Sequence, residues 1–293
     1  MPDNSIAILI PTKNRLVFLE RALESIYSGH VFPDEVIVVN DGSTDGTKEY
    51  LDKEMRTRGN LKVLHREKSG GVNSARNAGV RLAQSEWIFC LDDDDEMTPA
   101  FMEKGMPILR KAPADVGVVF FNTLIKKSKG EEFIGGYKFP SGEDAYFPTY
   151  DDFLLKKGRR GDNKPIFRKS MLVSRNFSFN EEVNGFESYD QTNLIKMGVR
   201  FMYAKELSTI VHQEHEERLS NTAGMRNPEV FFSINLRMIR EHHAVYDRHP
   251  RALARKYLDI AKLALRIKKF GAVVKYLLFC LLQEIKSLFS RQI

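Results

Sequence analysis

The chain has 293 residues, of which 42% are hydrophobic and 29% are charged, so its composition excludes a disordered or fibrous protein. At about 150 residues per domain, this length predicts one large domain or two small ones. The net charge of +6 favours an anionic partner such as nucleic acid, phosphate or acidic lipid.

The positive charge is confined to the C-terminal part of the chain. Residues 226–293 contain 14 Lys and Arg against five Asp and Glu, a local +9, whereas residues 1–225 sum to −3. This basic tail lacks the interleaved aromatic residues and the groove-reading motifs of nucleic-acid-binding proteins. We therefore expect no nucleic-acid partner.

Cysteine content and hydropathy indicate the compartment. Cys90 and Cys280 lie in apolar runs far apart in the sequence, which is typical of buried thiols in a reducing compartment. The opening residues have no signal-peptide pattern, and no apolar stretch reaches the roughly 18 residues of a transmembrane helix. These features predict a cytoplasmic protein, and the basic tail of residues 226–293 favours a peripheral position at the inner face of the cell membrane.

The first 125 residues alternate short apolar runs with amphipathic segments. The runs are rich in β-branched and aromatic residues and predict strands of a parallel sheet over Ile6–Ile10, Glu35–Val39, Leu61–Leu64, Trp87–Leu91 and Val116–Phe121. Helices are predicted over Leu16–Tyr27, Thr44–Arg58 and Ser74–Ala83, with N-caps at Ser43 or Thr44 and at Ser74, and from Pro99. The pattern predicts an α/β fold with a Rossmann-like, doubly wound, mostly parallel sheet.

The remaining residues carry weaker signals. Residues 126–165 predict loops and short strands, and helical periodicity returns near Tyr189–Met197, in Pro228–His242 and in Pro250–Phe289, with a break at Gly271. We expect one domain over residues 1–225, with halves 1–125 and 126–225. A basic amphipathic helical tail is expected over residues 226–293.

Five consecutive carboxylates, Asp92 to Glu96, follow the predicted fourth strand. They repel one another at the end of a buried strand, so a compensating cation is expected. Carboxylate oxygens select Mg²⁺ or Mn²⁺, and substrate phosphates complete the coordination shell. The alternative is a solvated acidic turn before the next helix.

Other strand ends also carry polar residues. Strand one is followed by PTKNR, strand two by NDGSTDG, and strand three by a glycine pair, Gly70–Gly71, that could approach a phosphate. Each could be no more than a tight turn. Because the carboxyl ends of parallel strands meet in one crevice, the sequence predicts a single nucleotide site there.

Together, PTKNR, EVIVVNDGSTDGT, SGGVNSARNAGV and WIFCLDDDDEMTP make the first 125 residues resemble the N-terminal half of family 2 glycosyltransferases. The resemblance implies a GT-A fold and an inverting, metal-dependent transferase that uses Mn²⁺ or Mg²⁺. The donor would be a nucleotide-diphosphate hexose or N-acetylhexosamine, with UDP favoured. The acceptor would be a glycan or lipid-linked glycan in surface polysaccharide synthesis.

The resemblance also assigns site residues. It implies that the metal binds Asp94, with Asp95 in support, and that Asp41 accepts a hydrogen bond from the base. Arg76 would either contact the nucleotide or hold its loop. The nucleotide-sugar would bind Pro11, Thr12, Asn14, Arg15, Asp41, Gly71, Arg76, Asn77, Asp92 and Asp93.

The general base is less clearly marked. Family members carry a Glu-Asp pair whose Asp is the base, but Ser188 stands at that position here. Glu187 and Asp190 can share a helix face and are both candidates. The resemblance also implies a histidine on the metal or diphosphate, best matched by His215, whereas zinc bound by His212 and His215 lacks further ligands nearby.

The tail has a broad apolar stripe with interleaved lysines and arginines, which favours contact with an anionic membrane surface. The stripe could instead pack on the catalytic domain or on a second copy of the chain. Two other functions stay open: a sugar nucleotidyltransferase, and a catalytically inactive nucleotide-binding or scaffold subunit.

Overall fold

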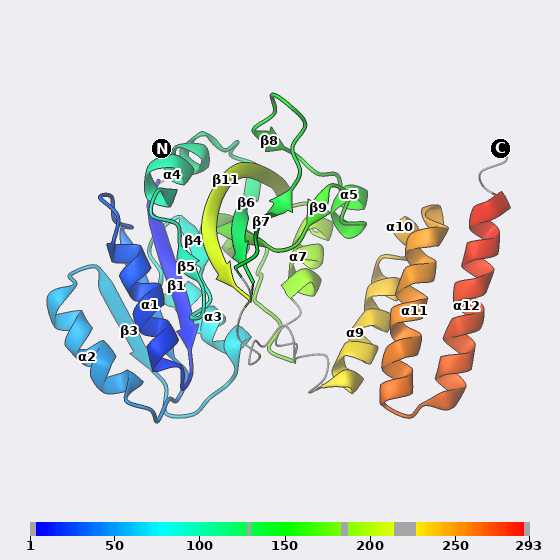
Figure 1. The fold of residues 1–293 in the computed structure, drawn as a ribbon, viewed down its shortest axis with the longest axis horizontal. Coiled ribbons are helices and arrows are strands. Elements are labelled where there is room, and N and C mark those ends of the chain that lie inside the picture. The colour runs from blue at the N-terminus through cyan, green and yellow to red at the C-terminus, as the bar shows by residue number, and fades with distance from the viewer. Residues whose placement is uncertain (1–3, 128–129, 183–186, 214–226, 290–293) are drawn as a thin grey trace. The chain divides into compact units, whose positions relative to one another are not determined.

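In a computed structural model of the chain, residues 4–127, 130–182, 187–213 and 227–289 are described (Figure 1). The chain divides into two compact units. The first comprises Met1–Asn184 and Asp190–Glu216, and the second comprises Gly185–Tyr189 and Glu217–Ile293. The predicted boundary at residues 225 and 226 stays a prediction.

The first unit is built on a mixed, mostly parallel sheet. In spatial order its main strands are β3 (Leu61–His65), β2 (Glu35–Asn40), β1 (Ile6–Thr12), β4 (Trp87–Cys90), β10 (Asn163–Arg168), β6 (Val116–Lys126), β11 (Arg200–His212) and β5 (Glu96–Met97). The first four strands are parallel, as predicted. The antiparallel β10 separates β4 from β6, and the sequence pattern does not predict this strand.

The predicted helices of the first half are present, although three of the four begin at a different residue. They are α1 (Leu16–Tyr27), α2 (Thr47–Thr57), α3 (Val72–Leu82) and α4 (Phe101–Lys111). The N-caps predicted at Ser43 or Thr44 and at Ser74 are wrong, because Gly46 and Gly71 take those positions with φ of 87° and 89°. Positive φ values favour glycine, so backbone conformation decides where these helices begin.

The region after β6 forms loops and short elements, as expected. These are β7 (Glu132–Tyr137), β8 (Ala145–Tyr146), α5 (Tyr150–Leu154), β9 (Arg159–Arg160) and α6 (Lys169–Ser174). Helix α7 (Glu187–Lys196) follows and contributes residues to both units.

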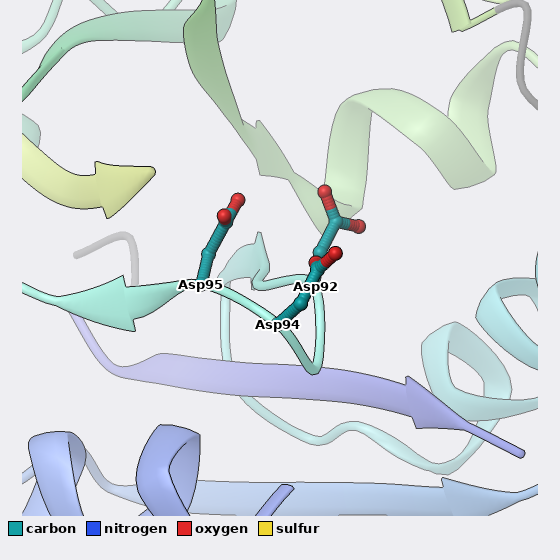
Figure 2. Close-up of side chains that lie close together, drawn as sticks. All are labelled: Asp92, Asp94 and Asp95. Atoms are coloured by element: carbon teal, nitrogen blue, oxygen red, sulfur yellow. The ribbon is translucent and has the colours of Figure 1, made fainter. Parts of the chain in front are cut away.

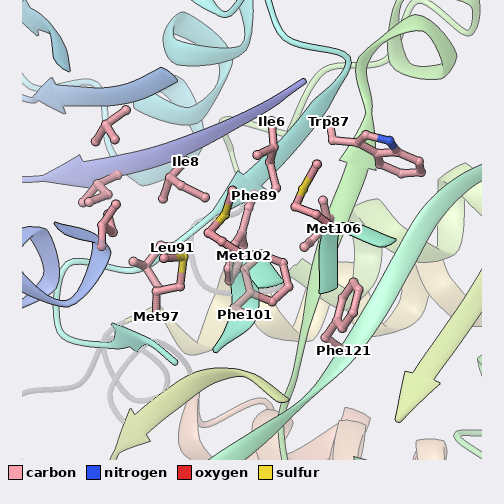
Figure 3. Packing of buried hydrophobic residues seen from close by; sticks show 14 of the residues in the cluster. Ile6, Ile8, Trp87, Phe89, Leu91, Met97, Phe101, Met102, Met106 and Phe121 are labelled. Atoms are coloured by element: carbon pink, nitrogen blue, oxygen red, sulfur yellow. The ribbon is translucent and has the colours of Figure 1, made fainter. Parts of the chain in front are cut away.

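Hydrophobic side chains cover both faces of the sheet. One cluster joins β1, β4 and β6 to α1 and α4, and Figure 3 shows Phe89, Phe101 and Phe121 within it. The opposite cluster joins the sheet to α3. Helix α3 lies so close to β1 that a Cβ on Gly79 would be 2.1 Å from Cδ1 of Leu9. This double coverage is why the apolar runs are nearly continuous.

The second unit contains four described helices: α9 (Pro228–Glu241), α10 (His243–Arg248), α11 (Pro250–Arg266) and α12 (Phe270–Phe289). Phe232, Ile260, Ala264 and Tyr276 are among its buried residues. The predicted break at Gly271 is wrong by a few residues, because α11 ends before Lys268, which has a φ of 58°, and Gly271 lies inside α12. Within the described ranges, no helix combines the length and apolar content needed to cross a membrane.

Candidate active site

The predicted site residues of the first unit gather at the carboxyl ends of β1, β2 and β4. Thr12 Oγ1 donates a hydrogen bond to Asp93, 2.8 Å away, and so joins the end of β1 to the turn after β4. Asp41 follows β2, and its backbone N–H donates to the Thr12 carbonyl at 2.9 Å. The structure therefore brings Thr12, Asp41 and Asp93 together, and their role in binding a nucleotide stays a prediction.

Asp41 holds the glycine loop that precedes α3. Its carboxylate accepts hydrogen bonds from the backbone N–H of Gly71 at 2.9 Å, from that of Gly70 at 3.1 Å and from the Ser69 hydroxyl at 2.7 Å. It also forms an ion pair with Arg66 at 2.9 Å. Asp41 is 3% exposed, so in this structure its carboxylate serves to fix the loop.

The turns after β1 and β2 are joined to each other. Asn14, in the left-handed region with a φ of 53°, donates its backbone N–H to Ser43 and accepts one from Thr44 through its side chain. Pro11 is buried within β1, opposite Val39. Asn14 therefore orders two loops, and its contact with a nucleotide stays a prediction.

Arg15 lies against the acidic run. Its guanidinium nitrogens are 3.2 Å from Asp93 Oδ1 and 2.9 Å from Asp94 Oδ2. Burial would lower the pKa of Arg15, but the charges of Asp93 and Asp94 outweigh it and raise that pKa. Burial raises the pKa of Asp93 to about 7, against the opposing effects of Arg15 and Thr12.

Asp92 is held by two cations. Its Oδ1 lies 2.8 Å from Arg76 of α3, and its Oδ2 lies 2.6 Å from Nζ of Lys164 on β10. Burial would raise the pKa of Asp92, but the charges of Lys164 and Arg76 outweigh it and keep the pKa well below its usual range. Arg76 is buried against Asp92, so it supports the site whether or not it contacts a ligand.

Lys164 contacts the acidic run, although the sequence pattern does not mark it as a site residue. Its Nζ also lies 2.8 Å from Asp95, which is fully buried. In the sequence Lys164 is one lysine of residues 126–165, a region predicted to form loops and short strands. Long-range pairing of β10 with β4 brings Lys164 to the acidic run, and local patterns do not encode that pairing.

The expected external cation is not required by charge alone. Within the described part of the chain, the five carboxylates contact four cationic side chains: Arg15, Arg21, Arg76 and Lys164. Arg21 pairs with Glu96 at 3.3 Å and donates to the backbone carbonyl of Asp94. The premise that these carboxylates lack compensation within the protein is therefore wrong.

The run nevertheless fits a divalent ion. Asp92, Asp94 and Asp95 each offer a carboxylate oxygen, and these oxygens all lie within 4.8 Å of one another (Figure 2). Carboxylate oxygens are the hard ligands that Mg²⁺ and Mn²⁺ prefer. Asp94 and the supporting Asp95 therefore stay candidates for metal binding.

Helix α3 anchors the segment that precedes α7. Asn77 exchanges hydrogen bonds with the backbone of Phe179, accepting its N–H at 2.8 Å and donating to its carbonyl at 2.9 Å. It also donates to Glu181 at 2.9 Å. Asn77 is 5% exposed, so the structure gives it an anchoring position, and its contact with a nucleotide stays a prediction.

The base and histidine candidates differ in their surroundings. Asp190 is buried and accepts the backbone N–H of Asn180 at 3.1 Å, whereas Glu187 is half-buried. His215 lies outside the described residues. His212 is described, and its Nε2 lies 2.5 Å from Oε1 of Glu96, so the strand that leads toward His215 contacts the acidic run.

Comparison with known proteins identifies the family. The sequence profile described as "Glycosyl transferase family 2" matches residues 7–178, which is more than half of the chain. The chain belongs to glycosyl transferase family 2.

Relatives and solved structures agree with this family. A GalNAc(5)-diNAcBac-PP-undecaprenol beta-1,3-glucosyltransferase of Campylobacter jejuni is 32% identical over 65% of this chain and 60% of the relative. The putative glycosyltransferase EpsH of Bacillus subtilis is 25% identical over 61% of this chain and 51% of the relative. The chain thus spans a little over half the length of these two relatives.

The solved structures show the fold. S. aureus TarS 1–349 in complex with UDP-GlcNAc has a TM-score of 0.61 at 17% identity and covers 93% of this chain and 89% of that chain. The mannosyltransferase PcManGT from Pyrobaculum calidifontis, in complex with GDP-Man and Mn²⁺, has a TM-score of 0.57 at 19% identity. The match covers 97% of this chain and 89% of that chain. This family 2 chain has the GT-A fold, as predicted.

Proposed function

We propose that the chain transfers a sugar from a nucleotide diphosphate to a hydroxyl of a glycan or lipid-linked glycan, with inversion at the anomeric carbon. The main support is the convergence of Thr12, Arg15, Asp41 and the acidic run at the strand ends of a family 2 glycosyltransferase. A site at the carboxyl ends of parallel strands suits a nucleotide, and carboxylates with arginines suit its metal-bound diphosphate.

In this proposal the residues of the site position the donor. Asp41 fixes Gly70 and Gly71 so that the glycine loop keeps its shape beside the nucleotide. Arg15, half-buried at the end of β1, can exchange its carboxylate partners for the diphosphate. A Mn²⁺ or Mg²⁺ ion held by Asp94, with His215 as a further candidate ligand and Asp95 in support, would neutralise charge on the leaving diphosphate.

The acceptor hydroxyl must lose its proton to a carboxylate as the bond to the sugar forms. Glu187 and Asp190 are the proposed bases. Glu187 is the more exposed of the two, which favours it, because the acceptor must reach the base. Glu187→Gln is expected to lower turnover by 100-fold or more with little change in donor affinity, in line with general-base contributions of about 10² to 10⁴.

Donor and acceptor classes are proposed from the relatives. A UDP-hexose or UDP-N-acetylhexosamine is supported by the UDP-GlcNAc complex of TarS, and GDP-mannose is the competing donor because PcManGT binds it. A polyprenyl-diphosphate-linked saccharide is supported by the printed activity of the Campylobacter relative. The corresponding role would be surface polysaccharide synthesis.

The second unit is proposed to contact an anionic membrane surface. Helix α12 exposes an apolar face made of Phe270, Val274, Leu277, Leu278, Leu281, Leu282 and Ile285. Lys268, Lys269, Lys275 and Lys286 are exposed on or near the same helix. An apolar face with adjacent lysines suits an acidic lipid interface, which would place the chain at the inner face of the cell membrane.

Vesicle flotation tests this contact. The chain should float with vesicles that contain phosphatidylglycerol, and substitution of Leu278 and Leu281 by serine should abolish flotation without loss of folding. A homo-oligomer that buries the same face would appear instead as a concentration-dependent mass, sensitive to the same substitutions and indifferent to lipid.

A donor panel tests the transferase assignment. UDP-, GDP- and dTDP-sugars are incubated with Mn²⁺ and candidate acceptors, and the released nucleotide is measured. A glycosyltransferase releases a nucleoside diphosphate, whereas a sugar nucleotidyltransferase forms or consumes pyrophosphate. Tight nucleotide binding without release of a nucleoside diphosphate would instead favour a catalytically inactive subunit. Ser188 supports this alternative, because it stands where family members carry the Asp that serves as the base.

A further inference from the structure

Lys164 is a buried lysine inside the acidic cluster formed by Asp92, Asp94 and Asp95. It lies on β10, and its side chain is 9% exposed. Buried lysines occur in proteins when they are paired, and Nζ of Lys164 lies 2.6 Å from Asp92 and 2.8 Å from Asp95. These two ion pairs place the positive charge of Lys164 against both carboxylates.

The contacts divide the cluster into two parts. Both oxygens of Asp92 contact cations, Arg76 on one side and Lys164 on the other. Asp95 is fully buried against the same lysine. Asp94 is paired with Arg15, whose side chain is 20% exposed and follows a strand end. Because the side chain of Arg15 is more exposed than that of Lys164, Arg15 can move toward solvent more readily.

Lys164 lowers the negative charge of the acidic cluster. Its Nζ lies 2.6 Å from Asp92 and 2.8 Å from Asp95. Removal of Lys164 would make the cluster more negative by about one unit of charge. Attraction of a divalent ion rises with that charge, and a nucleotide diphosphate supplies further negative charge when it binds.

We propose that Lys164 is a resident cation of the acidic cluster that neutralises Asp92 and Asp95, confines a divalent ion to the side of Asp94, and keeps metal affinity low until the donor diphosphate binds. This inference rests on the metal site of the proposed function and deepens it. Lys164 acts through the carboxylates, so it is a positioning residue.

Metal binding to the nucleotide-free chain tests the proposal. Free Mn²⁺ is measured by electron paramagnetic resonance during titration of the wild type and of Lys164→Met. Loss of one positive charge beside the site is expected to tighten Mn²⁺ binding about tenfold or more without nucleotide. The gain in Mn²⁺ affinity on addition of UDP should be smaller in the variant than in the wild type.

A matched control removes a comparable ion pair elsewhere. Lys62 on β3 pairs with the buried Glu35 of β2, away from the acidic run. Lys62→Met should leave the affinity for Mn²⁺ unchanged. An equal increase in both variants would show that general charge causes the effect and would overturn the proposal.

Folding is monitored because Lys164→Met leaves Asp92 and Asp95 without this cation. The double variant Lys164→Met/Asp95→Asn restores the charge balance. It should unfold at a higher temperature than the single variant and bind Mn²⁺ about as weakly as the wild type. Added Mn²⁺ should raise the unfolding temperature of Lys164→Met more than that of the wild type.

Two results would contradict the proposal. A folded Lys164→Met that binds Mn²⁺ no more tightly than the wild type, or a double variant no more stable than the single one, would overturn it and leave the proposed transferase intact. Failure of every variant to bind Mn²⁺, even with UDP, would overturn the metal site of the proposed function together with this inference.

Discussion

Asp41 provides a test of whether hydrogen bonds to its carboxylate hold the glycine loop before α3 in place. Asp41→Ala removes the acceptor for the N–H groups of Gly70 and Gly71 and for the Ser69 hydroxyl. Hydrogen bonds to a charged group contribute about 1.5–3 kcal/mol each when both partners are buried, but Gly70 is exposed and can bind water instead. The ion pair between the half-buried Arg66 and the buried Asp41 adds about 1 kcal/mol.

The expected loss is therefore about 3 kcal/mol of the free energy of unfolding. It is measured by urea denaturation with the fluorescence of Trp87, the single tryptophan, which is 1% exposed in the first unit. Amide hydrogen exchange at Gly70 and Gly71 should accelerate in the variant, because both N–H groups lose their carboxylate acceptor.

Asp45 is the matched control. It lies in the same loop, is exposed, and accepts hydrogen bonds from Leu16 and Thr47 near the beginning of two helices. Asp45→Ala should cost about 1 kcal/mol, as removal of a helix cap does. A loss below 1 kcal/mol for Asp41→Ala, with unchanged exchange at Gly70 and Gly71, would refute the role given to Asp41.

Three further predictions follow from the contacts of single residues. Burial disfavours the charged form of Glu35, but hydrogen bonds from Lys62 and Ser85 outweigh it and lower its pKa from 4.5 to about 2. The stability contributed by Glu35 is therefore present above about pH 4.5 and lost as the pH falls toward 2. In urea denaturation, Glu35→Gln should lower the free energy of unfolding by about 2 kcal/mol at pH 7 and by much less at pH 3. An equal cost at both pH values would contradict this. Gly79→Val should lower stability by about 3 kcal/mol in the same assay, since its side chain would overlap Leu9, and a stable variant would disprove the close approach of α3 to β1. Asp94→Ala should abolish Mn²⁺-stimulated sugar transfer, and full activity of this variant with metal chelated would exclude a metal at Asp94.

The sequence predicts well what short segments encode. Strands β1, β2 and β4 are predicted because their apolar runs are buried on both faces. Helix α1 is predicted at its observed bounds because its apolar spacing is helical. Helix ends were predicted less well. Gly71 rather than Ser74 precedes α3, because the Asp41 carboxylate fixes the glycine loop from another strand.

The part of the site that the sequence does not predict depends on the pairing of β10 with β4 and β6. Strand β10 contains Pro165, Lys164 and Arg168, which are not typical of a central strand, and its position between β4 and β6 depends on residues distant in the sequence. Because the sequence does not predict β10, it does not show that Lys164 lies beside the acidic run. An external cation is therefore expected from the sequence, whereas in the structure side chains from other elements already pair with these carboxylates.

The most direct test of the account measures both products of one reaction. The chain is incubated with Mn²⁺, a UDP-sugar and a polyprenyl-diphosphate-linked saccharide, and UDP and the extended saccharide are quantified together by mass spectrometry. We expect equal amounts of UDP and of acceptor extended by one sugar, with the anomeric configuration inverted relative to the donor by NMR. Nucleotide binding without product from any UDP-, GDP- or dTDP-sugar, or transfer with retained configuration, would contradict the proposed inverting glycosyltransferase.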